Sequence, residues 1–264
     1  MQTRFVRRPD GARIAYQSGG LPDGPPLLLL QGQANSHRWW HGIRDGFEQT
    51  HRTITVDYRG TGSSTAHESL NEGWSTETFA EDVVAVLDDL RLDTADVYGT
   101  SMGGRVGQML AIRHPARVGR LVLACTSPGG RLAHERDASV RRLLADPDPT
   151  VRRETLLDLM YTPVWSRTNR SSNLLGDPTM SPVAARLHLR VSGRHDAYDL
   201  LPQIDSPTLV LHGTEDRMTP AINAELIAQR IPDATARLTE GGRHGFFDEF
   251  RHDVTARVLA FLTR

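Results

Sequence analysis

The sequence has no lysine and only one cysteine, Cys125, among its 264 residues. All 31 basic residues are therefore arginine, and Schiff-base catalysis through a lysine amine is excluded. A single cysteine can form no internal disulfide and cannot build a thiolate metal site alone. We interpret Cys125 as a small buried residue at the end of a strand rather than as a reactive thiol.

A large excess of one charge and a long apolar run are also missing. The formal net charge is −1 and the arginines are spread along the chain, which predicts no surface for nucleic acid or an anionic membrane. No segment approaches the roughly 18 uninterrupted apolar residues of a membrane-spanning helix, and residues 1–16 lack the apolar region of a secretory signal. We expect a cytoplasmic protein that needs no metal or other cofactor and acts on a small molecule; a homodimer stays open.

Strand and helix patterns alternate along most of the chain. Short β signals occupy residues 3–7, 12–18, 26–30 and 52–57, and from Ser75 the apolar residues recur at helical spacing. A strand ending at Tyr98, a helix ending near Pro115 and a strand at residues 120–125 follow. This alternation predicts an α/β fold with a mostly parallel sheet flanked by helices, whose functional groups lie at the carboxyl ends of the strands.

The alternation fails over residues 127–204, which are rich in arginine and aspartate. Helical patterns occur there near residues 138–145, 149–161 and 182–194. A strand at residues 208–212, a helix at 222–231, a strand near 236–238 and a last helix then resume the alternation. We predict a core made of residues 1–126 and 205–264, and a helical cap made of residues 127–204.

Residues 99–103 read Gly-Thr-Ser-Met-Gly and match G-x-S-x-G between an expected strand and an expected helix. The small residues beside Ser101 allow the close backbone approach of a sharp, strained turn, which lifts the serine Oγ out of the sheet. In a chain with 23 glycines, the pattern alone also fits a glycine-rich turn with a capping serine. The strand-turn-helix context therefore carries the prediction that Ser101 is a nucleophile.

A serine hydroxyl needs a base that takes its proton, and the base needs a carboxylate that fixes its tautomer. Asp216 follows the strand that ends near His212, and His244 lies in a loop after the last short strand. The chain order Ser101, Asp216, His244 is the order expected of this triad on this type of sheet. Glu215 stays an alternative acid, and we expect His212 to be packed or hydrogen-bonded rather than catalytic.

Four stretches together, GTSMGG, VDYRGTGSS, HGTEDRMTP and GGRHGFF, resemble motifs of the α/β-hydrolase superfamily. The chain is most similar to the small bacterial group of 3-oxoadipate enol-lactonases, cofactor-free haloperoxidase-type esterases and related carboxylesterases. The resemblance implies an eight-stranded sheet with a helical cap inserted after the sixth strand. It also implies nucleophile Ser101, acid Asp216 and base His244. Members of the superfamily that act as dehalogenases or epoxide hydrolases carry aspartate where this chain has Ser101.

An oxyanion formed during acyl transfer needs two hydrogen-bond donors. One is expected to be the backbone N–H of Met102, and the other comes from the loop after the third strand, which by its position in the resembled family is Gln33. Gln31 replaces the histidine that is usual in that family, and its amide can brace the loop by donating and accepting hydrogen bonds. The side chain of Gln33 either offers the substrate a polar contact or lies solvated at the rim, and Gln31 also counts among the candidate pocket residues.

The expected cap contains large apolar residues at roughly helical spacing. We predict that Met160, Tyr161 and Trp165 contribute to the substrate pocket, and packing of the cap on the core is the alternative. An arginine of the cap is a further candidate, as a partner for a substrate carboxylate.

The sequence therefore predicts a serine hydrolase that cleaves a small ester or lactone through an acyl-enzyme on Ser101. Two alternatives from other classes remain. One is a non-hydrolytic biosynthetic enzyme or perhydrolase on the same scaffold, and the other is a ligand receptor that keeps the triad and only binds.

Overall fold

The computed structural model describes residues 1–67 and 73–263, and these form one eight-stranded sheet in the order β1-β2-β4-β3-β5-β6-β7-β8. The strand β2 is antiparallel to both of its neighbours, and the other pairs are parallel. The strands are β1 (Thr3–Arg7), β2 (Arg13–Gly20), β3 (Pro26–Leu30), β4 (Arg52–Val56), β5 (Ala95–Thr100), β6 (Val118–Ala124), β7 (Thr208–Gly213) and β8 (Ala234–Thr239).

The central strand β3 explains why both faces of the sheet are covered. Its four leucines have no exposed surface, and they alternate between two apolar clusters. Leu28 and Leu30 belong to the cluster on one face, whereas Leu27 and Leu29 belong to the cluster on the other. Successive side chains of a strand point to opposite faces, so a continuous apolar run is what a strand covered on both sides requires.

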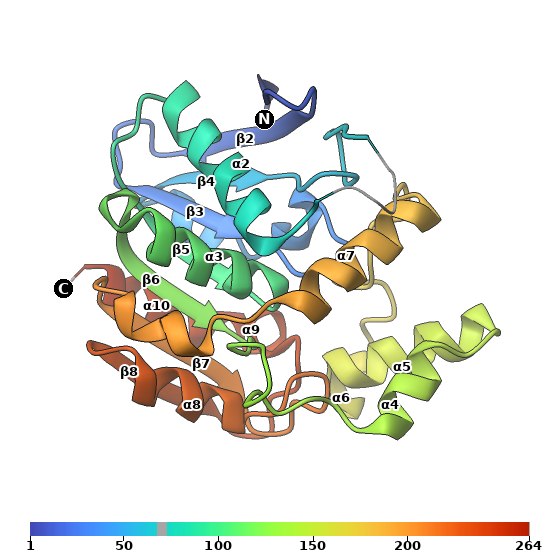
Figure 1. Cartoon of the computed structure of the whole chain (residues 1–264). Coiled ribbons are helices and arrows are strands. Elements are labelled where there is room, and N and C mark those ends of the chain that lie inside the picture. The colour runs from blue at the N-terminus through green and yellow to red at the C-terminus, as the bar shows by residue number, and fades with distance from the viewer. Residues whose placement is uncertain (68–72, 264) are drawn as a thin grey trace.

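Helices pack on each face of the sheet. One cluster includes apolar residues of α2 (Thr76–Asp89), α3 (Met102–Arg113) and α8 (Ile222–Arg230). The other includes residues of η1 (His37–Trp40), α1 (Asp45–Glu48), α9 (Phe246–Glu249) and α10 (Arg251–Leu262). In Figure 1, α2, α3 and α8 lie in front of the sheet and α10 lies behind it. The predicted α/β fold is confirmed.

A helical segment separates β6 from β7, as expected. It contains α4 (Ala138–Leu144), α5 (Pro149–Met160), α6 (Pro163–Ser166), α7 (Pro182–Arg194) and η3 (Tyr198–Gln203). Figure 1 shows α4, α5 and α6 standing off from the sheet, while α7 returns toward it. Ala184, Leu187 and Val191 of α7 join the same apolar cluster as α2 and α3. The division into a core and a cap stays a prediction, because α7 shares its core with the sheet.

One strand boundary differs from the sequence expectation in a way that matters for function. The strand β5 continues to Thr100 and does not end at Tyr98, so Ser101 follows it directly. The short elements α6 and η3 were not expected, because four and six residues are too few for a periodic pattern. Within the described residues, no helix combines the length and apolarity that crossing a bilayer requires.

Candidate active site

Ser101 occupies a strained turn between β5 and α3. Its φ is 52° and its ψ is −119°, a conformation that non-glycine residues rarely adopt. The two flanking glycines are required by close packing. A Cβ at Gly99 would lie 2.4 Å from the carbonyl oxygen of Gly103, and a Cβ at Gly103 would lie 2.1 Å from the carbonyl oxygen of Leu30. The turn places Ser101 at the carboxyl edge of the sheet with part of its surface exposed.

Neighbouring strands hold this turn through backbone hydrogen bonds. The N–H of Ser101 donates to Ala124 O at 2.9 Å, and Thr126 Oγ1 donates to Ser101 O at 2.7 Å. Both partners come from the end of β6 and the loop behind it. A strained residue persists only where its surroundings fix it, and these bonds do so for Ser101.

The structure brings Ser101, His244 and Asp216 into one hydrogen-bonded chain. His244 Nε2 lies 3.0 Å from Ser101 Oγ, and His244 Nδ1 lies 2.8 Å from Asp216 Oδ2. The carboxylate and the imidazole are buried, whereas Ser101 is reachable from outside. The side chain of Glu215 is exposed, and its Oε2 lies 3.9 Å from Arg243 Nε. The carboxylate that contacts His244 is therefore that of Asp216.

The surroundings of Asp216 stabilise its charged form. The N–H groups of Met218 and Thr219 donate to Oδ1 at 2.9 and 2.8 Å, and His212 Nε2 is 3.2 Å from Oδ2. Burial by itself acts to raise the pKa of Asp216, but the interactions with His244 and His212 outweigh it and hold the pKa well below its usual range. His212 also donates Nε2–H to Thr219 O at 2.8 Å, which agrees with the hydrogen-bonded interpretation of this histidine.

The end of α5 anchors the loop that carries His244. The N–H of His244 donates to Leu159 O at 3.1 Å, and the N–H of Gly245 donates to Met160 O at 2.7 Å. The exposed carboxylate of Asp158 pairs with Arg243 in this loop and with Arg217 beside Asp216. The helical segment therefore supports both loops that meet at Ser101.

The loop after β3, residues 31–36, lies next to this chain of contacts and is called the β3 loop below. Gln31 is fully buried, and its Nε2 donates to Val56 O at 2.6 Å and to Asn35 O at 3.3 Å. These bonds brace the loop, so the amide nitrogen of Gln31 faces the protein interior. A place for Gln31 in the substrate pocket stays a prediction.

Within the described residues, two backbone N–H groups are unused: that of Met102, directly after Ser101, and that of Gln33 in the β3 loop. Met102 is the first residue of α3, a position whose N–H has no partner within the helix. The N–H of Gln33 donates to no other group in the part of the chain that the structure describes. The carbonyl oxygen of Gln33 accepts from Asn35 Nδ2 at 2.8 Å. These free donors are the ones expected for an oxyanion site, and their role stays a prediction.

The candidate pocket residues Met160, Tyr161 and Trp165 lie where α5 meets α6. Tyr161 is fully buried, and its hydroxyl is 2.7 Å from Asp248 Oδ2 and 2.5 Å from Ser172 Oγ. Its ring stacks on Trp165 with centroids 3.9 Å apart, and Met160 is buried as well. These contacts are typical of packing, and contact with the substrate stays a prediction for all three residues.

Sequence reasoning missed two residues that hold the β3 loop from the helical segment. His188 of α7 accepts a hydrogen bond from the N–H of Ala34 through Nδ1 at 3.3 Å. The N–H of Asp177 donates to Ala34 O at 2.8 Å. The one signal in the sequence is a histidine on the buried face of α7, between Ala184 and Val191. Burial in an apolar helix face alone does not reveal such a contact.

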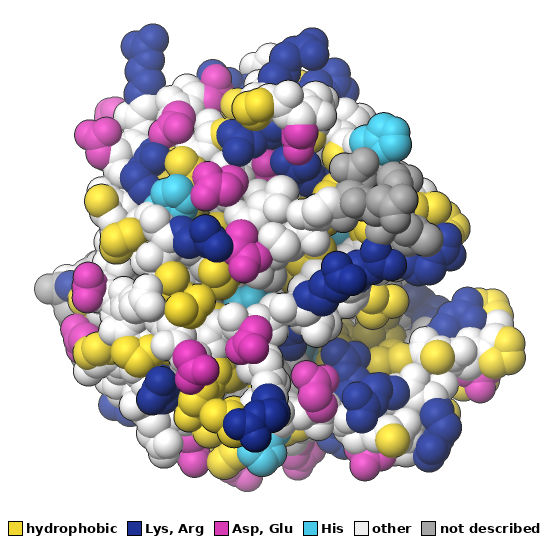
Figure 2. Space-filling view, viewed as in Figure 1, with side chains coloured by type: hydrophobic (Ala, Val, Ile, Leu, Met, Phe, Trp, Pro, Cys, Tyr) yellow, Lys and Arg dark blue, Asp and Glu magenta, His cyan; other side chains and the backbone are white. Residues whose placement is uncertain are grey.

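The surface of the molecule is hollowed beside the β3 loop. A cavity of about 380 Å³ is lined by Asn35 and Ser36 of the β3 loop, by Arg153 of α5 and by part of the segment 172–178. Figure 2 shows a hollow between α7 and the α4 and α5 pair, with basic side chains on both sides of it. Among residues 1–67 and 73–263, no group of three or more His, Cys, Asp or Glu side chains is arranged to hold a metal ion.

Comparison with known proteins gives a consistent assignment. The alpha/beta hydrolase fold family matches residues 25–250. A putative carbamate hydrolase of Variovorax paradoxus is 31% identical over 263 residues, covering 94% of this chain and 97% of the relative. An esterase from Rhodococcus sp. superposes with a TM-score of 0.86 at 27% identity, covering 100% of this chain and 99% of the esterase. An N-acyl homoserine lactone degrading enzyme superposes with a TM-score of 0.83 at 26% identity, covering 98% and 100%.

Proposed function

This chain belongs to the α/β-hydrolase fold family and is a hydrolytic enzyme, and on that premise we propose that it cleaves small esters or lactones through an acyl-enzyme on Ser101. The observation that carries the proposal is the continuous contact from Ser101 Oγ through His244 to Asp216, over distances of 3.0 and 2.8 Å. A nucleophile, a base and an orienting carboxylate in this geometry are what acyl transfer to serine requires.

In the proposed reaction, His244 Nε2 takes the proton of Ser101 as Oγ attacks the carbonyl carbon of the substrate. Asp216 accepts the Nδ1–H of His244, which fixes the tautomer and stabilises the imidazolium that forms. His244 then gives the proton to the departing alkoxide oxygen, and the acyl-enzyme remains. Water then attacks the acyl carbon while His244 takes its proton. As the bond between the acyl carbon and Oγ breaks, His244 gives that proton to Oγ, which releases the acid and restores Ser101.

The N–H groups of Met102 and Gln33 are the proposed donors to the oxyanion of each tetrahedral intermediate. Loss of one such donor costs about 3 to 4 kcal/mol of transition-state stabilisation in enzymes of this kind. Ser101 lies at the N-terminus of α3, whose partial positive charge also favours the developing anion. The lowered pKa of Asp216 keeps its carboxylate charged at neutral pH.

Replacement of Ser101 tests this proposal. Ser101→Ala removes the nucleophile, and we expect hydrolysis of p-nitrophenyl acetate to fall by about 10⁴-fold or more. Ser63→Ala is the matched control, because Ser63 is exposed and its side chain makes no contact with the triad. Retention of full esterase activity by Ser101→Ala contradicts the proposal. Failure of a fluorophosphonate probe to label the wild-type enzyme instead favours the receptor alternative.

Carbamates are a second candidate substrate class, favoured by the 31% identity to a putative carbamate hydrolase. Attack of Ser101 on a carbamate carbonyl passes through the same tetrahedral geometry, so the proposed residues keep their roles. Comparison of kcat/KM for p-nitrophenyl acetate, a simple δ-lactone and an aryl carbamate separates the classes. Adding hydrogen peroxide to the ester assay and following halide oxidation tests the perhydrolase alternative.

A further inference from the structure

Ala34 is a strained residue of the β3 loop, and its backbone is held on both sides. It adopts a φ of 56° although it is not glycine, and both of its backbone polar groups are bound by the helical segment between β6 and β7. His188 accepts its N–H at 3.3 Å, and Asp177 donates to its carbonyl oxygen at 2.8 Å. The conformation of the loop therefore depends on residues more than 140 positions away in the chain.

The protonation state of His188 follows from its two partners. Nε2 lies 2.8 Å from Arg59 O, a group that only accepts, so Nε2 carries the proton. Nδ1 is then free to accept the N–H of Ala34, and only the neutral Nε2–H tautomer satisfies both contacts. Burial lowers the pKa of His188 to about 4, which keeps the ring neutral near neutral pH.

The ring of His188 is also fixed in place. It is completely buried, and it packs against Phe79, Trp74 and Tyr58 with centroid distances of 5.4, 6.0 and 6.4 Å. Its other anchor, Arg59, is itself held by two hydrogen bonds to the buried carboxylate of Asp82, at 2.7 and 2.8 Å. The hydrogen bond that this ring accepts from the N–H of Ala34 therefore holds the main chain in a defined position.

The peptide unit between Gln33 and Ala34 is held at both ends. Asn35 Nδ2 donates to its carbonyl oxygen at 2.8 Å, and His188 accepts its N–H at 3.3 Å. Only the φ and ψ of Gln33 separate this fixed peptide plane from the peptide that carries the Gln33 N–H, so fixing the plane restricts the directions that this free N–H can take. We propose that His188 is a positioning residue for the reaction, because its hydrogen bond to Ala34 aims the Gln33 N–H at the oxyanion. The inference rests on the proposed function, in which that N–H is the second donor.

Two substitutions separate the contact with Ala34 from the contact with Arg59. In His188→Asn, the amide oxygen can take the place of Nδ1 and accept the N–H of Ala34, but the side chain is too short to reach Arg59 O. In His188→Gln, the amide nitrogen can take the place of Nε2 and donate to Arg59 O, but the contact with Ala34 is lost. Both variants lose the same ring packing, so each serves as the control for the other.

We expect His188→Asn to keep kcat for p-nitrophenyl acetate within about 3-fold of wild type, and His188→Gln to lose about 10²-fold, since small misplacements of catalytic groups cost about that much. KM is expected to change little in either variant, and affinity for a trifluoromethyl ketone, which forms a tetrahedral adduct with serine, is expected to fall with kcat. Thermal unfolding of both variants reports the shared packing loss.

Equal losses in kcat for the two variants, or a greater loss in His188→Asn, overturn the inference, because the aromatic packing or the Arg59 contact then explains the effect. The inference is also overturned if kcat falls in His188→Gln while affinity for the trifluoromethyl ketone stays unchanged. Ser101→Ala assayed in parallel separates the two failures: if it stays active, the proposed function fails and the inference fails with it, whereas if it is inactive, the His188 variants judge the inference alone.

Discussion

The sheet has two ends, one at the carboxyl ends of the parallel strands and the opposite one at their amino ends, and the two differ in backbone strain. Among the described residues, four that are not glycine have a positive φ, and three of them, Ala34, Ser101 and Cys125, follow the carboxyl ends of β3, β5 and β6. The fourth, Arg91, lies after α2 at the opposite end. Backbone strain persists only where surrounding contacts enforce it. Three of the four strained residues lie at the carboxyl ends of the strands, so the contacts at that end enforce a defined backbone geometry against strain.

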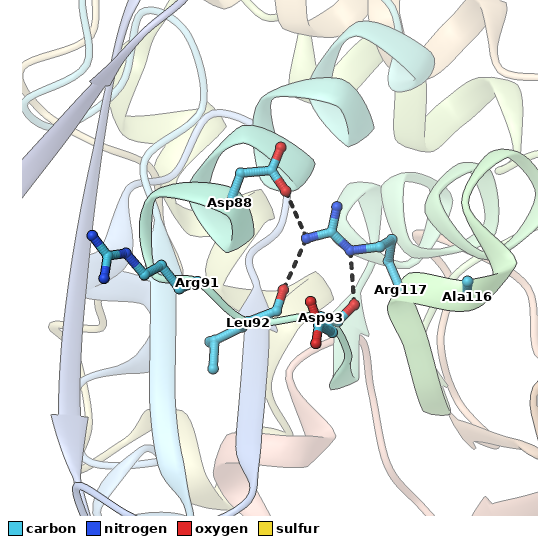
Figure 3. Close-up of a pocket in the computed structure, with 6 residues that line it drawn as sticks. All are labelled: Asp88, Arg91, Leu92, Asp93, Ala116 and Arg117. Atoms are coloured by element: carbon cyan, nitrogen blue, oxygen red, sulfur yellow. Dashed lines mark hydrogen bonds and ion pairs between the residues drawn. The ribbon is translucent and has the colours of Figure 1, made fainter.

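The opposite end holds a cavity of about 450 Å³ in which Arg117 binds the residues around it. Arg117, just before β6, donates from Nε to Asp93 O at 2.8 Å and from Nη2 to Leu92 O at 2.9 Å, and it pairs with Asp88 (Figure 3). A cation near the carboxyl end of α2, which ends at Asp89, interacts favourably with the dipole of that helix. At this end the donors of Arg117 are occupied, whereas at the carboxyl end the N–H groups of Met102, directly after Ser101, and of Gln33, in the β3 loop, are free within the described residues.

The largest effect is expected from Asp216→Asn at the carboxyl end. The amide no longer stabilises the imidazolium and favours the wrong tautomer of His244, so kcat for p-nitrophenyl acetate should fall by about 10⁴-fold. Glu215→Gln is the matched control in the adjacent position, and it should stay within about 2-fold of wild type. The reverse ranking of the two variants would make Glu215 the acid.

Gly103→Ala tests whether the close approach at the nucleophile turn is required. The added Cβ would lie 2.1 Å from Leu30 O, so the turn must open, and we expect loss of activity together with about 1 to 3 kcal/mol of unfolding free energy. Gly193→Ala in α7 is the control, because no atom lies within 4 Å of the added Cβ. Normal activity in Gly103→Ala contradicts a strained, required turn.

The free energy of unfolding, measured against pH, tests the two buried histidines of the helical segment between β6 and β7, His188 and His195. Burial lowers the pKa of His188 to about 4 and that of His195 to about 3, from 6.5. Both rings are neutral in the fold, so their contribution is complete above pH 6.5 and is lost as the pH falls toward 4 and 3. The free energy of unfolding, measured with urea, should decline from pH 7 to pH 4. The decline should be smaller in His188→Asn than in the wild type. An unchanged slope in that variant indicates that His188 is not buried in its neutral form.

The smallest effect is expected at the opposite end. Arg117→Ala removes the hydrogen bonds to Leu92 O and Asp93 O and should cost about 1 to 2 kcal/mol of unfolding free energy. Esterase activity should stay unchanged, because the cavity in Figure 3 lies at the start of β5, away from Ser101. A large loss of activity without loss of stability would remove the distinction between the two ends.

The sequence predicted the fold class and the residues that the structure brings together at Ser101, because each of them lies in a turn or loop that follows an expected strand. It predicted Asp216 as the acid and kept Glu215 as an alternative, because the directions in which two neighbouring side chains of a turn point cannot be read from the sequence. The partnership of His188 with Ala34 was beyond prediction, because it joins residues 154 positions apart and has no local pattern. For the same reason, the contacts of Tyr161 with Asp248 and Ser172 emerged only from the structure.

Trapping the acyl-enzyme tests the central claim most directly. Wild-type enzyme is mixed with p-nitrophenyl acetate, quenched in acid during the first turnovers and digested, and the peptides are examined by mass spectrometry. We predict an acetyl group on Ser101 in the wild type and no acetylation in Ser101→Ala. An active enzyme that carries the acetyl group on another residue would contradict the proposal that the strained serine between β5 and α3 is the nucleophile.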